Sequence, residues 1–398
     1  MTGTAAIDMA PKWTEASAAR VGVSRLMLTD FRNYETARIE TDGHSVVLTG
    51  ENGAGKTNIL EALSFLSPGR GLRRAKLGEV VRSGEAPAPI GRCWAVAAKI
   101  SGPEGDADVG TGLDPDSQGI ERRIVRVDGQ TERAQSVLCD YLSVIWLTPQ
   151  MDGLFIDGPG ARRRFLDRLV YAADAAHAGR VTAYETAMRE RARLLADRGM
   201  GADPTWLDAL EATMTEKGMA VAAARRDMVG RLAAFAVADS GPFPGAELAL
   251  TGGPEAWLDE GPALEAEDRF RAALRDGRAV DAQDGRTRVG PHRTDLDVRH
   301  AAKGRVAAQC STGEQKALLI GLVLAHARMQ SAADGRRPIL LLDEVVAHLD
   351  ADRRQALFGL LDELDTQVWL TGTDAALFDG MSAETRFFTV ADGSVVAS

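Results

Sequence analysis

The chain has 398 residues, of which 45% are hydrophobic and 26% are charged. These fractions are those of an ordinary globular protein, and they exclude collagen, coiled coil and disorder as descriptions of the whole chain. At roughly 150 residues per domain, the length allows two or three domains, or one large α/β domain with an insertion. The net charge of −10, taken alone, argues against nucleic-acid binding, because DNA phosphates require local positive charge.

Neither the cysteines nor the termini indicate export or a membrane. Cys93, Cys139 and Cys310 are far apart and form no CxxC pair, so we expect no zinc ribbon, no disulfide framework and a reducing, cytoplasmic location. Residues 1–20 are small and polar, and we predict a disordered leader and not a signal peptide. The longest apolar run, 317–325, is far short of the roughly 18 residues that a membrane span needs.

The first 150 residues predict mainly β-structure. Apolar residues alternate from Ser24 onward and end in a buried-strand run just before Gly50, which a helical pattern follows. Residues 90–134 predict further strands, with an acidic loop at 101–119 and a hairpin turn at Asp128-Gly129. A buried strand is expected at 144–149.

Beyond residue 160 the pattern becomes helical. Up to residue 240 we expect two antiparallel helices of about 30 residues each, an arm roughly 45 Å long, broken by a Gly/Pro turn at 197–204. A strand is expected from 246 and a charged helix near 263–276. The last 110 residues alternate strands and helices, which indicates a parallel sheet. The predicted strands are 286–290, 338–344 and 367–372, the helices are 312–330 and 351–364, and a hairpin covers 386–397.

A P-loop motif lies between the strand that precedes Gly50 and the helix after it. The sequence GENGAGKT matches GxxxxGK[ST], in which backbone N–H groups and the helix N-terminus surround phosphates. Lys56 is expected to reach the β- and γ-phosphates, and Thr57 to bind Mg²⁺. The alternative is a glycine-rich turn that matches by chance, and the flanking elements argue against it. The predicted ATP-binding residues of this loop are Gly50, Glu51, Asn52, Gly53, Ala54, Gly55, Lys56 and Thr57.

Two carboxylates follow the buried strand PILLL. Ligands bind at the carboxyl edge of a parallel sheet, so Asp343 is expected to hold Mg²⁺ and Glu344 to activate the attacking water. The alternative is an ordinary strand end with solvated carboxylates. With Lys56, these two residues form the predicted catalytic set.

The sequence STGEQ at 311–315 resembles the signature motif of ABC-type ATPases, usually SGGQ. In such proteins the motif lies at a helix N-terminus and contacts the γ-phosphate held by a second subunit, which assigns Ser311 and Gly313 a role in trans. The alternative is a capping box of Ser311 with Glu314, and both can hold at once. Asp350 falls at the D-loop position of that class.

Four blocks together carry a more specific resemblance. LMLTDFRNYE, GENGAGKTNILEALSFLSPGRGLR, LTPQMDGLFIDGPGARRRFLD and GPHRTDL keep their order along the chain and look like the RecF family of SMC-like DNA-repair ATPases. The likeness spans about residues 23–397. It implies an α/β P-loop ABC-type head with a helical arm. The predicted parts are a leader (1–20), an N-terminal lobe (21–159), the arm (160–240) and a C-terminal lobe (241–398).

The resemblance also implies a mechanism. ATP and Mg²⁺ are the expected cofactors of a homodimer that closes around two ATP molecules, binds DNA, and helps recombinase loading at gaps with recombination-mediator partner proteins. Gln150 takes the Q-loop position. The switch histidine of transporters is missing, because Gly372 and Thr373 follow the last parallel strand, which suggests a weak, slow ATPase. The alternative function, the nucleotide-binding subunit of an ABC-type transporter, predicts that histidine.

Two basic runs are the DNA-binding candidates. Their alternative is a solvated surface, the usual meaning of a charge run. Acidic stretches at 101–119 and 254–268 are expected to lie away from DNA. His292 of the GPHR block is interpreted as structural, and Thr294 stands where the family often has an acid. The basic candidates are Arg70, Arg73, Arg74, Lys76, Arg162, Arg163 and Arg164.

Overall fold

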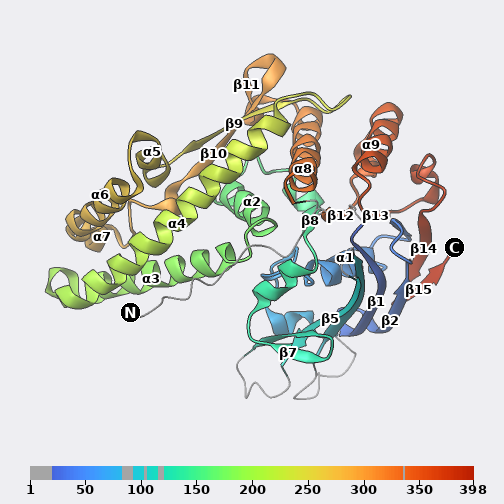
Figure 1. Ribbon diagram of the computed structural model, residues 1–398, viewed down its shortest axis with the longest axis horizontal. Coiled ribbons are helices and arrows are strands. Elements are labelled where there is room, and N and C mark those ends of the chain that lie inside the picture. The colour runs from blue at the N-terminus through green and yellow to red at the C-terminus, as the bar shows by residue number, and fades with distance from the viewer. Residues whose placement is uncertain (1–19, 83–92, 103–104, 115–120, 335–336) are drawn as a thin grey trace, which may run out of the picture.

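The computed structural model describes residues 20–82, 93–102, 105–114, 121–334 and 337–398. The predicted leader therefore lies outside the described residues, apart from Arg20. The molecule is elongated, with two six-stranded sheets at one end and a group of helices at the other (Figure 1). No helix in the described ranges combines the length and the apolar composition of a membrane span.

A six-stranded sheet forms the centre of the head, in the order β15-β14-β3-β13-β12-β8. All neighbours are parallel except the C-terminal hairpin β14–β15. The N-terminal strand β3 lies between the C-terminal strands β14 and β13, and β8 pairs with β12, so the predicted N- and C-terminal lobes build one head. The strands are β3 (Val46–Thr49), β8 (Val144–Leu147), β12 (Ile339–Leu342), β13 (Val368–Gly372), β14 (Arg386–Ala391) and β15 (Ser394–Ala397).

An antiparallel sheet covers the other side of helix α1 (Lys56–Ser64), in the order β2-β1-β4-β5-β6-β7. Its Asp128-Gly129 hairpin is confirmed, since Val127 pairs with Gln130. The helix side chains Ile59 and Leu60 are buried in the core that both sheets share. The strands are β1 (Gly22–Phe31), β2 (Tyr34–Glu40), β4 (Ala95–Gly102), β5 (Gly105–Leu113), β6 (Arg123–Val127) and β7 (Gln130–Glu132).

The predicted acidic loop at 101–119 is wrong over the part that is described. Strand β5 runs through it and pairs with β4 from Gly105 to Gly112. Ala107 and Val109 face the core while Asp106 and Asp108 face outward. The acidic residues hid the alternation, because each takes the solvent side of a half-buried strand.

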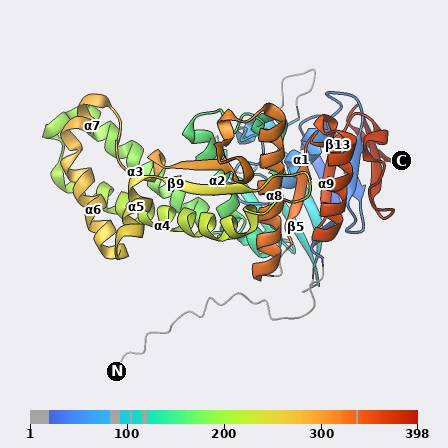
Figure 2. The same ribbon diagram turned by 90° about the horizontal axis from the view of Figure 1, so that it is seen from above.

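The predicted arm consists of three helices instead of two. Helix α2 (Pro159–Tyr171) ends before α3 (His177–Arg198), and α4 (Pro204–Ala236) follows the predicted turn at 197–204. The first expected helix is divided because α2 packs its apolar side chains, among them Phe165 and Leu169, into the core of the head. Helix α3 instead packs along α4 (Figures 1 and 2).

The helical lobe continues past the predicted boundary at residue 240. Helices α5 (Gly253–Glu260), α6 (Ala263–Asp276) and α7 (Arg278–Asp284) pack beside α3 and α4, and Phe270 shares a small core with Tyr184. A three-stranded antiparallel sheet, β11-β10-β9, joins this lobe to the head. Its strands are β9 (Ala246–Thr251), β10 (Asp295–His300) and β11 (Arg305–Val306).

The strand predicted at 286–290 is wrong, because these residues form a connection into β10. Gly290 has φ 136°, a conformation that turns the chain and that other residues rarely adopt. The helices predicted after it are confirmed as α8 (Thr312–Asp334) and α9 (Ala351–Leu364). Both pack against the parallel sheet through apolar faces, which places their N-termini at the head surface.

Candidate nucleotide site

The P-loop connects β3 to α1 through glycines with positive φ. Gly50, Gly53 and Gly55 have φ of 147°, 87° and 117°. A Cβ on Gly50 would lie 2.2 Å from the carbonyl oxygen of Val390, so only glycine fits beside β14. Within the described part of the chain, no side chain caps the N-terminus of α1, which leaves its N–H groups available to an anion.

Lys56 is folded back over this loop. Its Nζ donates to the carbonyl oxygens of Gly50 at 2.6 Å and Glu51 at 2.8 Å. Burial lowers the pKa of Lys56, while the carboxylates of Glu344 and Asp343 oppose that shift. Phosphate oxygens are stronger acceptors for an ammonium group than peptide carbonyls are. A phosphate in the loop would therefore draw Lys56 away from the two carbonyls.

Two residues of the β1–β2 turn hold the P-loop from outside. Asn33 Nδ2 donates to the carbonyl oxygen of Ala54 at 3.0 Å, and Tyr34 OH donates to that of Gly55 at 3.1 Å. Asn58 of α1 donates to Asn33 Oδ1 at 2.7 Å. In the sequence, this turn contributed only to the resemblance to a family. The contact of Asn33 and Tyr34 with the P-loop could not be predicted from hydrophobic periodicity, because it joins a turn to a loop.

Asp343 lies at the end of β12, against the start of α1. It accepts hydrogen bonds from Thr57 Oγ1, at 2.9 and 3.1 Å to its two oxygens, and from Thr371 Oγ1 at 2.8 Å. Burial raises the pKa of Asp343, and the two threonine hydroxyls partly offset this. A cation here would favour the ionised carboxylate. One hydroxyl and one carboxylate, completed by phosphate and water oxygens, fit the usual coordination of Mg²⁺.

Glu344 follows with φ 53°, a left-handed conformation that is uncommon for a residue with a Cβ. Such strain costs about 1–3 kcal/mol and is concentrated at functional sites. Its backbone N–H donates to Thr371 Oγ1 at 2.9 Å. Thr371 thus contacts both members of the acidic pair, and sequence reasoning missed it. Thr371 lies at the end of β13, beside β12 in the parallel sheet, and this position at the ligand-binding edge could have identified it as a site residue.

Ser311 forms the predicted capping box at the start of α8. Its backbone N–H donates to Glu314 Oε2 at 2.8 Å, and the N–H of Glu314 points back to Ser311 Oγ at 3.4 Å. Hydrogen bonds from Lys303 and Ser311 lower the pKa of Glu314 to about 2. Ser311 and Gly313 are both exposed. The cap therefore presents the helix N-terminus to solvent, as an ABC-type signature requires.

The other two predicted nucleotide contacts lie in surface loops of the head. Gln150 is exposed just after β8, whose Leu147 carbonyl accepts from the N–H of Asp343 at 2.9 Å. It therefore follows the same sheet edge as the acidic pair. Asp350 is the N-cap of α9, where its carboxylate accepts from the N–H of Arg353 at 2.8 Å.

The basic candidates differ from one another in the structure. Arg73 is bound to the buried Glu61 at 2.7 Å and to Asn58, and Arg162 forms a two-point ion pair with Asp295 at 2.7 and 2.9 Å. Asp295 neutralises Arg162, but Glu61 is also paired with Arg32, so its single charge is shared by two arginines. The prediction that the two basic runs face DNA as a whole therefore needs correction at Arg162, whose guanidinium group is already paired within the protein.

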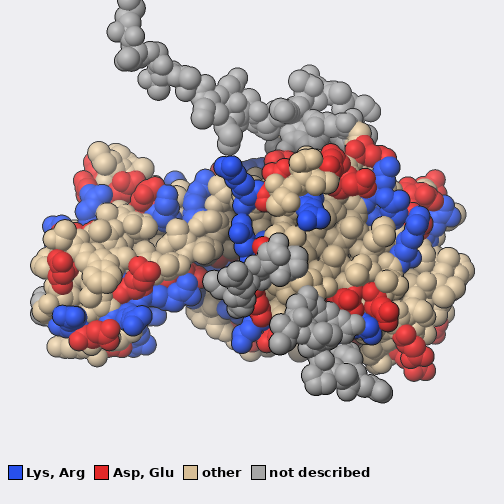
Figure 3. All heavy atoms as spheres, turned by 90° about the horizontal axis from the view of Figure 1, so that it is seen from below, with Lys and Arg blue, Asp and Glu red and all other residues tan. Residues whose placement is uncertain are grey.

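The remaining candidates are more open. Among the described residues, Arg70 and Lys76 are exposed and their side chains make no ion pair. Arg163 donates to the carbonyl oxygen of Thr294, while Arg164 is exposed. On the face drawn in Figure 3, Lys and Arg side chains gather where the helical lobe meets the head.

The fold and this site define an ABC-type ATPase head with a helical lobe. Residues 22–395 match the model of the RecF/RecN/SMC N-terminal domain. The structure resembles one described as the recombination mediator protein RecF with ATP in the RecFOR pathway, with a TM-score of 0.81 at 20% identity, over 97% of this chain and 100% of that one. An SMC head domain from Pyrococcus furiosus gives a TM-score of 0.53 at 17% identity, over 95% of this chain and 96% of that one.

Relatives with higher sequence identity indicate the family within this class. The DNA replication and repair protein RecF of Rhizobium rhizogenes is 49% identical over 95% of this chain and 99% of its own length. That of Mesorhizobium japonicum is also 49% identical, over 95% and 98%. The chain belongs to the RecF family. The transporter-subunit alternative is thereby excluded.

Proposed function

We propose that this chain is an ATP-operated switch of DNA repair, which dimerises on ATP, holds DNA in that state and releases it on hydrolysis. The observation that carries the proposal is the assembly of Lys56, Thr57, Asp343 and Glu344 at one sheet edge, with the signature helix exposed elsewhere on the same head. The relatives named above as repair and mediator proteins support the biological setting.

The chain's own residues have distinct roles in this proposal. The P-loop N–H groups and Lys56 bind the phosphates, and Thr57 with Asp343 holds Mg²⁺, which neutralises charge on the phosphates. Glu344 orients the attacking water and accepts its proton. Thr371 keeps the acidic pair in place through its two hydrogen bonds. Gln150 follows the same edge and is assigned to sensing the γ-phosphate.

Dimerisation follows from the exposure of the signature. Ser311 and Gly313 are exposed at the N-terminus of α8, and a two-fold dimer would place them on the γ-phosphate of the partner. Asp350 lies at the start of the neighbouring helix α9 and is assigned to the same interface. ATP thus becomes part of the contact between two copies, and its hydrolysis weakens that contact.

Slow hydrolysis is supported by the end of β13. Gly372 and Thr373 occupy the place where transporters have a histidine, so no second proton-transfer group faces the phosphate from this strand. Slow hydrolysis would keep the ATP-bound dimer on DNA long enough to bind recombination-mediator partners and to assist recombinase loading at gaps. Arg70 and Lys76 are the proposed phosphate contacts on the head.

Size-exclusion chromatography and DNA retention, each with and without ATP, test the proposal on three proteins. Wild type should dimerise and hold DNA only with ATP. Glu344→Gln should stay dimeric on DNA because hydrolysis is blocked, and Lys56→Ala should do neither. The proposal is wrong if all three remain monomeric and fail to retain DNA.

A further inference from the structure

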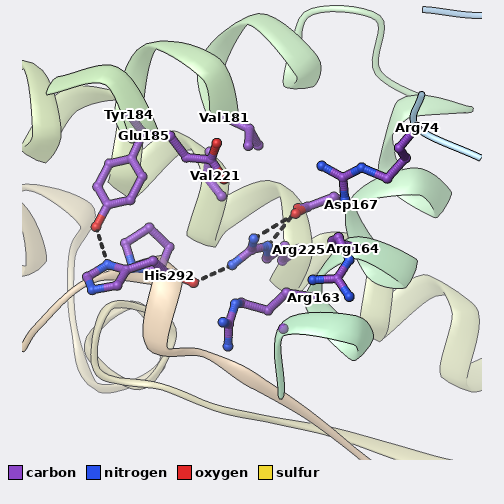
Figure 4. A pocket seen from close by; sticks show the side chains of 12 residues that line it. Arg74, Arg163, Arg164, Asp167, Val181, Tyr184, Glu185, Val221, Arg225 and His292 are labelled. Atoms are coloured by element: carbon purple, nitrogen blue, oxygen red, sulfur yellow. Dashed lines mark hydrogen bonds and ion pairs between the residues drawn. The ribbon is translucent and has the colours of Figure 1, made fainter. Parts of the chain in front are cut away.

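A cavity of about 520 Å³ lies between the head and the helical lobe, apart from the P-loop. Five separate parts of the chain line it, one of which is α3. Arg74 comes from the segment after α1, Arg163 and Arg164 from α2, Arg225 from α4, and His292 from the GPHR block (Figure 4). In the sequence, Arg74, Arg163 and Arg164 belong to two separate basic runs, both of them DNA-binding candidates. The fold instead gathers members of both runs around one hollow.

The acidic residues of this cavity do not neutralise its arginines. Asp167 is bound by Arg225 through two hydrogen bonds of 2.8 Å, and its Oδ1 also lies 2.9 Å from His177 Nε2. Its two oxygens are therefore occupied. Four arginines line the cavity against two acids, Asp167 and Glu185, which leaves two positive charges in excess.

Three guanidinium groups remain available to a ligand. Arg163 uses Nη1 for the carbonyl oxygen of Thr294, at 2.7 Å, and Arg74 and Arg164 are exposed, without an ion pair in the described part of the chain. A Cβ on Gly160 would lie 3.2 Å from Arg164 Nη1 and 3.7 Å from Arg163 Nη2. The absence of a side chain at Gly160 therefore leaves these two groups open on the cavity side.

His292 and Tyr184 form a fixed, neutral part of the wall. His292 Nε2 lies 2.9 Å from the carbonyl oxygen of Thr287, so this nitrogen carries the proton, and Tyr184 OH donates to Nδ1 at 2.7 Å. Burial lowers the pKa of His292, and nearby Arg293 and Arg163 lower it further. Val181 and Val221 add apolar wall. The positive charge offered to a bound molecule therefore comes from the arginines.

We propose that this cavity, which we call the inter-lobe arginine pocket, binds a phosphate group through Arg74, Arg163 and Arg164. Planar guanidinium groups donate pairs of hydrogen bonds to phosphate oxygens, and several arginines on one hollow match a dianionic or trianionic ligand. The phosphate belongs either to a free phosphate compound or to a DNA strand. In the second case the proposal rests on the DNA binding proposed above.

A ligand here would lie at the boundary between the head and the helical lobe, because α3 and α4 supply the opposite wall of the cavity. Arg74 follows α1 and Arg164 lies on α2, which packs into the core of the head, so a phosphate between them would join these two segments of the head. That contact is independent of the P-loop. Its loss should therefore leave ATP binding intact.

The test uses the full chain with its P-loop filled by ATPγS and Mg²⁺. Inorganic pyrophosphate is titrated by calorimetry in one arm, and single-stranded and duplex oligonucleotides by anisotropy in the other. The variant is Arg74→Gln with Arg164→Gln. The matched control, Arg189→Gln with Arg193→Gln, removes the same charge from exposed positions of α3 that do not line the pocket.

A loss of tenfold or more in pyrophosphate affinity, in the pocket variant alone, identifies a free phosphate ligand. A loss of tenfold or more in DNA affinity, with a shallower dependence on salt, identifies a strand phosphate. Equal affinities of pocket variant and control in both arms overturn the proposal. ATP-dependent dimerisation is measured on the same samples and should persist in both variants. If it persists while the affinities are equal, only the pocket proposal fails, whereas loss of dimerisation in the control as well would contradict the proposed function.

Discussion

Thr57 Oγ1 lies 2.9 Å from Asp343 Oδ1, although 286 positions separate these residues along the chain. The contact joins the first turn of α1 to the end of β12, and Thr371 completes it from β13. Two strands of the parallel sheet and helix α1 thus converge on one carboxylate. The nucleotide site depends on this sheet edge as much as on the P-loop itself.

Thr371→Val should slow ATP hydrolysis at least tenfold with little change in ATP affinity. Valine has the shape of threonine but lacks the hydroxyl that bonds Asp343 and the N–H of Glu344. Loss of these hydrogen bonds costs about 1–3 kcal/mol and loosens the acidic pair. Phosphate release and nucleotide titration measure the two quantities. Thr371→Ser, which keeps the hydroxyl, serves as control, and equal rates for both variants would contradict the assigned role.

Mg²⁺ affinity should fall as the pH is lowered. Burial raises the folded-state pKa of Asp343, so the protonated form persists to higher pH than in the unfolded chain. In the metal-free protein, Asp343 therefore contributes to the free energy of unfolding at pH values below its unfolded-state pKa. This contribution is lost as the pH rises through the folded-state pKa. Mg²⁺ binding needs the ionised form and therefore releases a proton. Nucleotide-linked Mg²⁺ titrations across the acidic range measure this, with Asp343→Asn expected to abolish the proton release.

Arg162→Ala should destabilise the protein without changing the salt dependence of DNA binding. Arg162 is mostly buried and paired with Asp295 at two points, and breaking such a pair costs about 1–3 kcal/mol at its partial exposure. Arg70→Ala is the converse case, with lower DNA affinity and unchanged stability, since Arg70 is exposed. Denaturant unfolding and DNA titration against salt separate the two. A flattened salt slope for Arg162→Ala alone would restore it as a DNA contact.

Ser311→Asn should prevent ATP-dependent dimerisation while leaving α8 stable. Asparagine is as good an N-cap as serine, so the capping role survives, but its larger amide replaces the hydroxyl assigned to the partner's γ-phosphate. Ser311→Thr keeps both functions and is the control. Thermal unfolding checks the cap, and size-exclusion chromatography with ATP checks the interface. Normal dimerisation of Ser311→Asn would remove Ser311 from that interface.

The sequence predicted the parts of the site that are local. The P-loop, the capping box of Ser311 with Glu314 and the Asp128-Gly129 turn each depend on residues a few positions apart, and each appears in the structure as expected. The strand at β5 and the false strand at 286–290 show where local patterns fail. Both β5 and residues 286–290 are polar segments with a few apolar residues, so their sequences do not show which one forms a strand. Only pairing with a neighbouring strand, which β5 has with β4, distinguishes them.

The basic runs show the same limit for charge. Arg162, Arg163 and Arg164 are adjacent in sequence, yet the first is neutralised by Asp295 and the other two line a cavity with Arg74. A run of basic residues in the sequence shows which charged groups are present, but it does not show which of them form ion pairs in the folded protein. That depends on helix α2 meeting β10, a contact between segments more than a hundred residues apart.

By itself, the sequence determined the class of this protein, because phosphate binding requires a compact motif whose residues are neighbours in the chain. The tertiary structure alone decided that Thr371 supports Asp343 and Glu344. It also decided that the helical lobe extends past residue 240 and that one arginine pocket forms between lobe and head. The physical reason is that burial and charge pairing are set by contacts between distant segments, which no local pattern encodes.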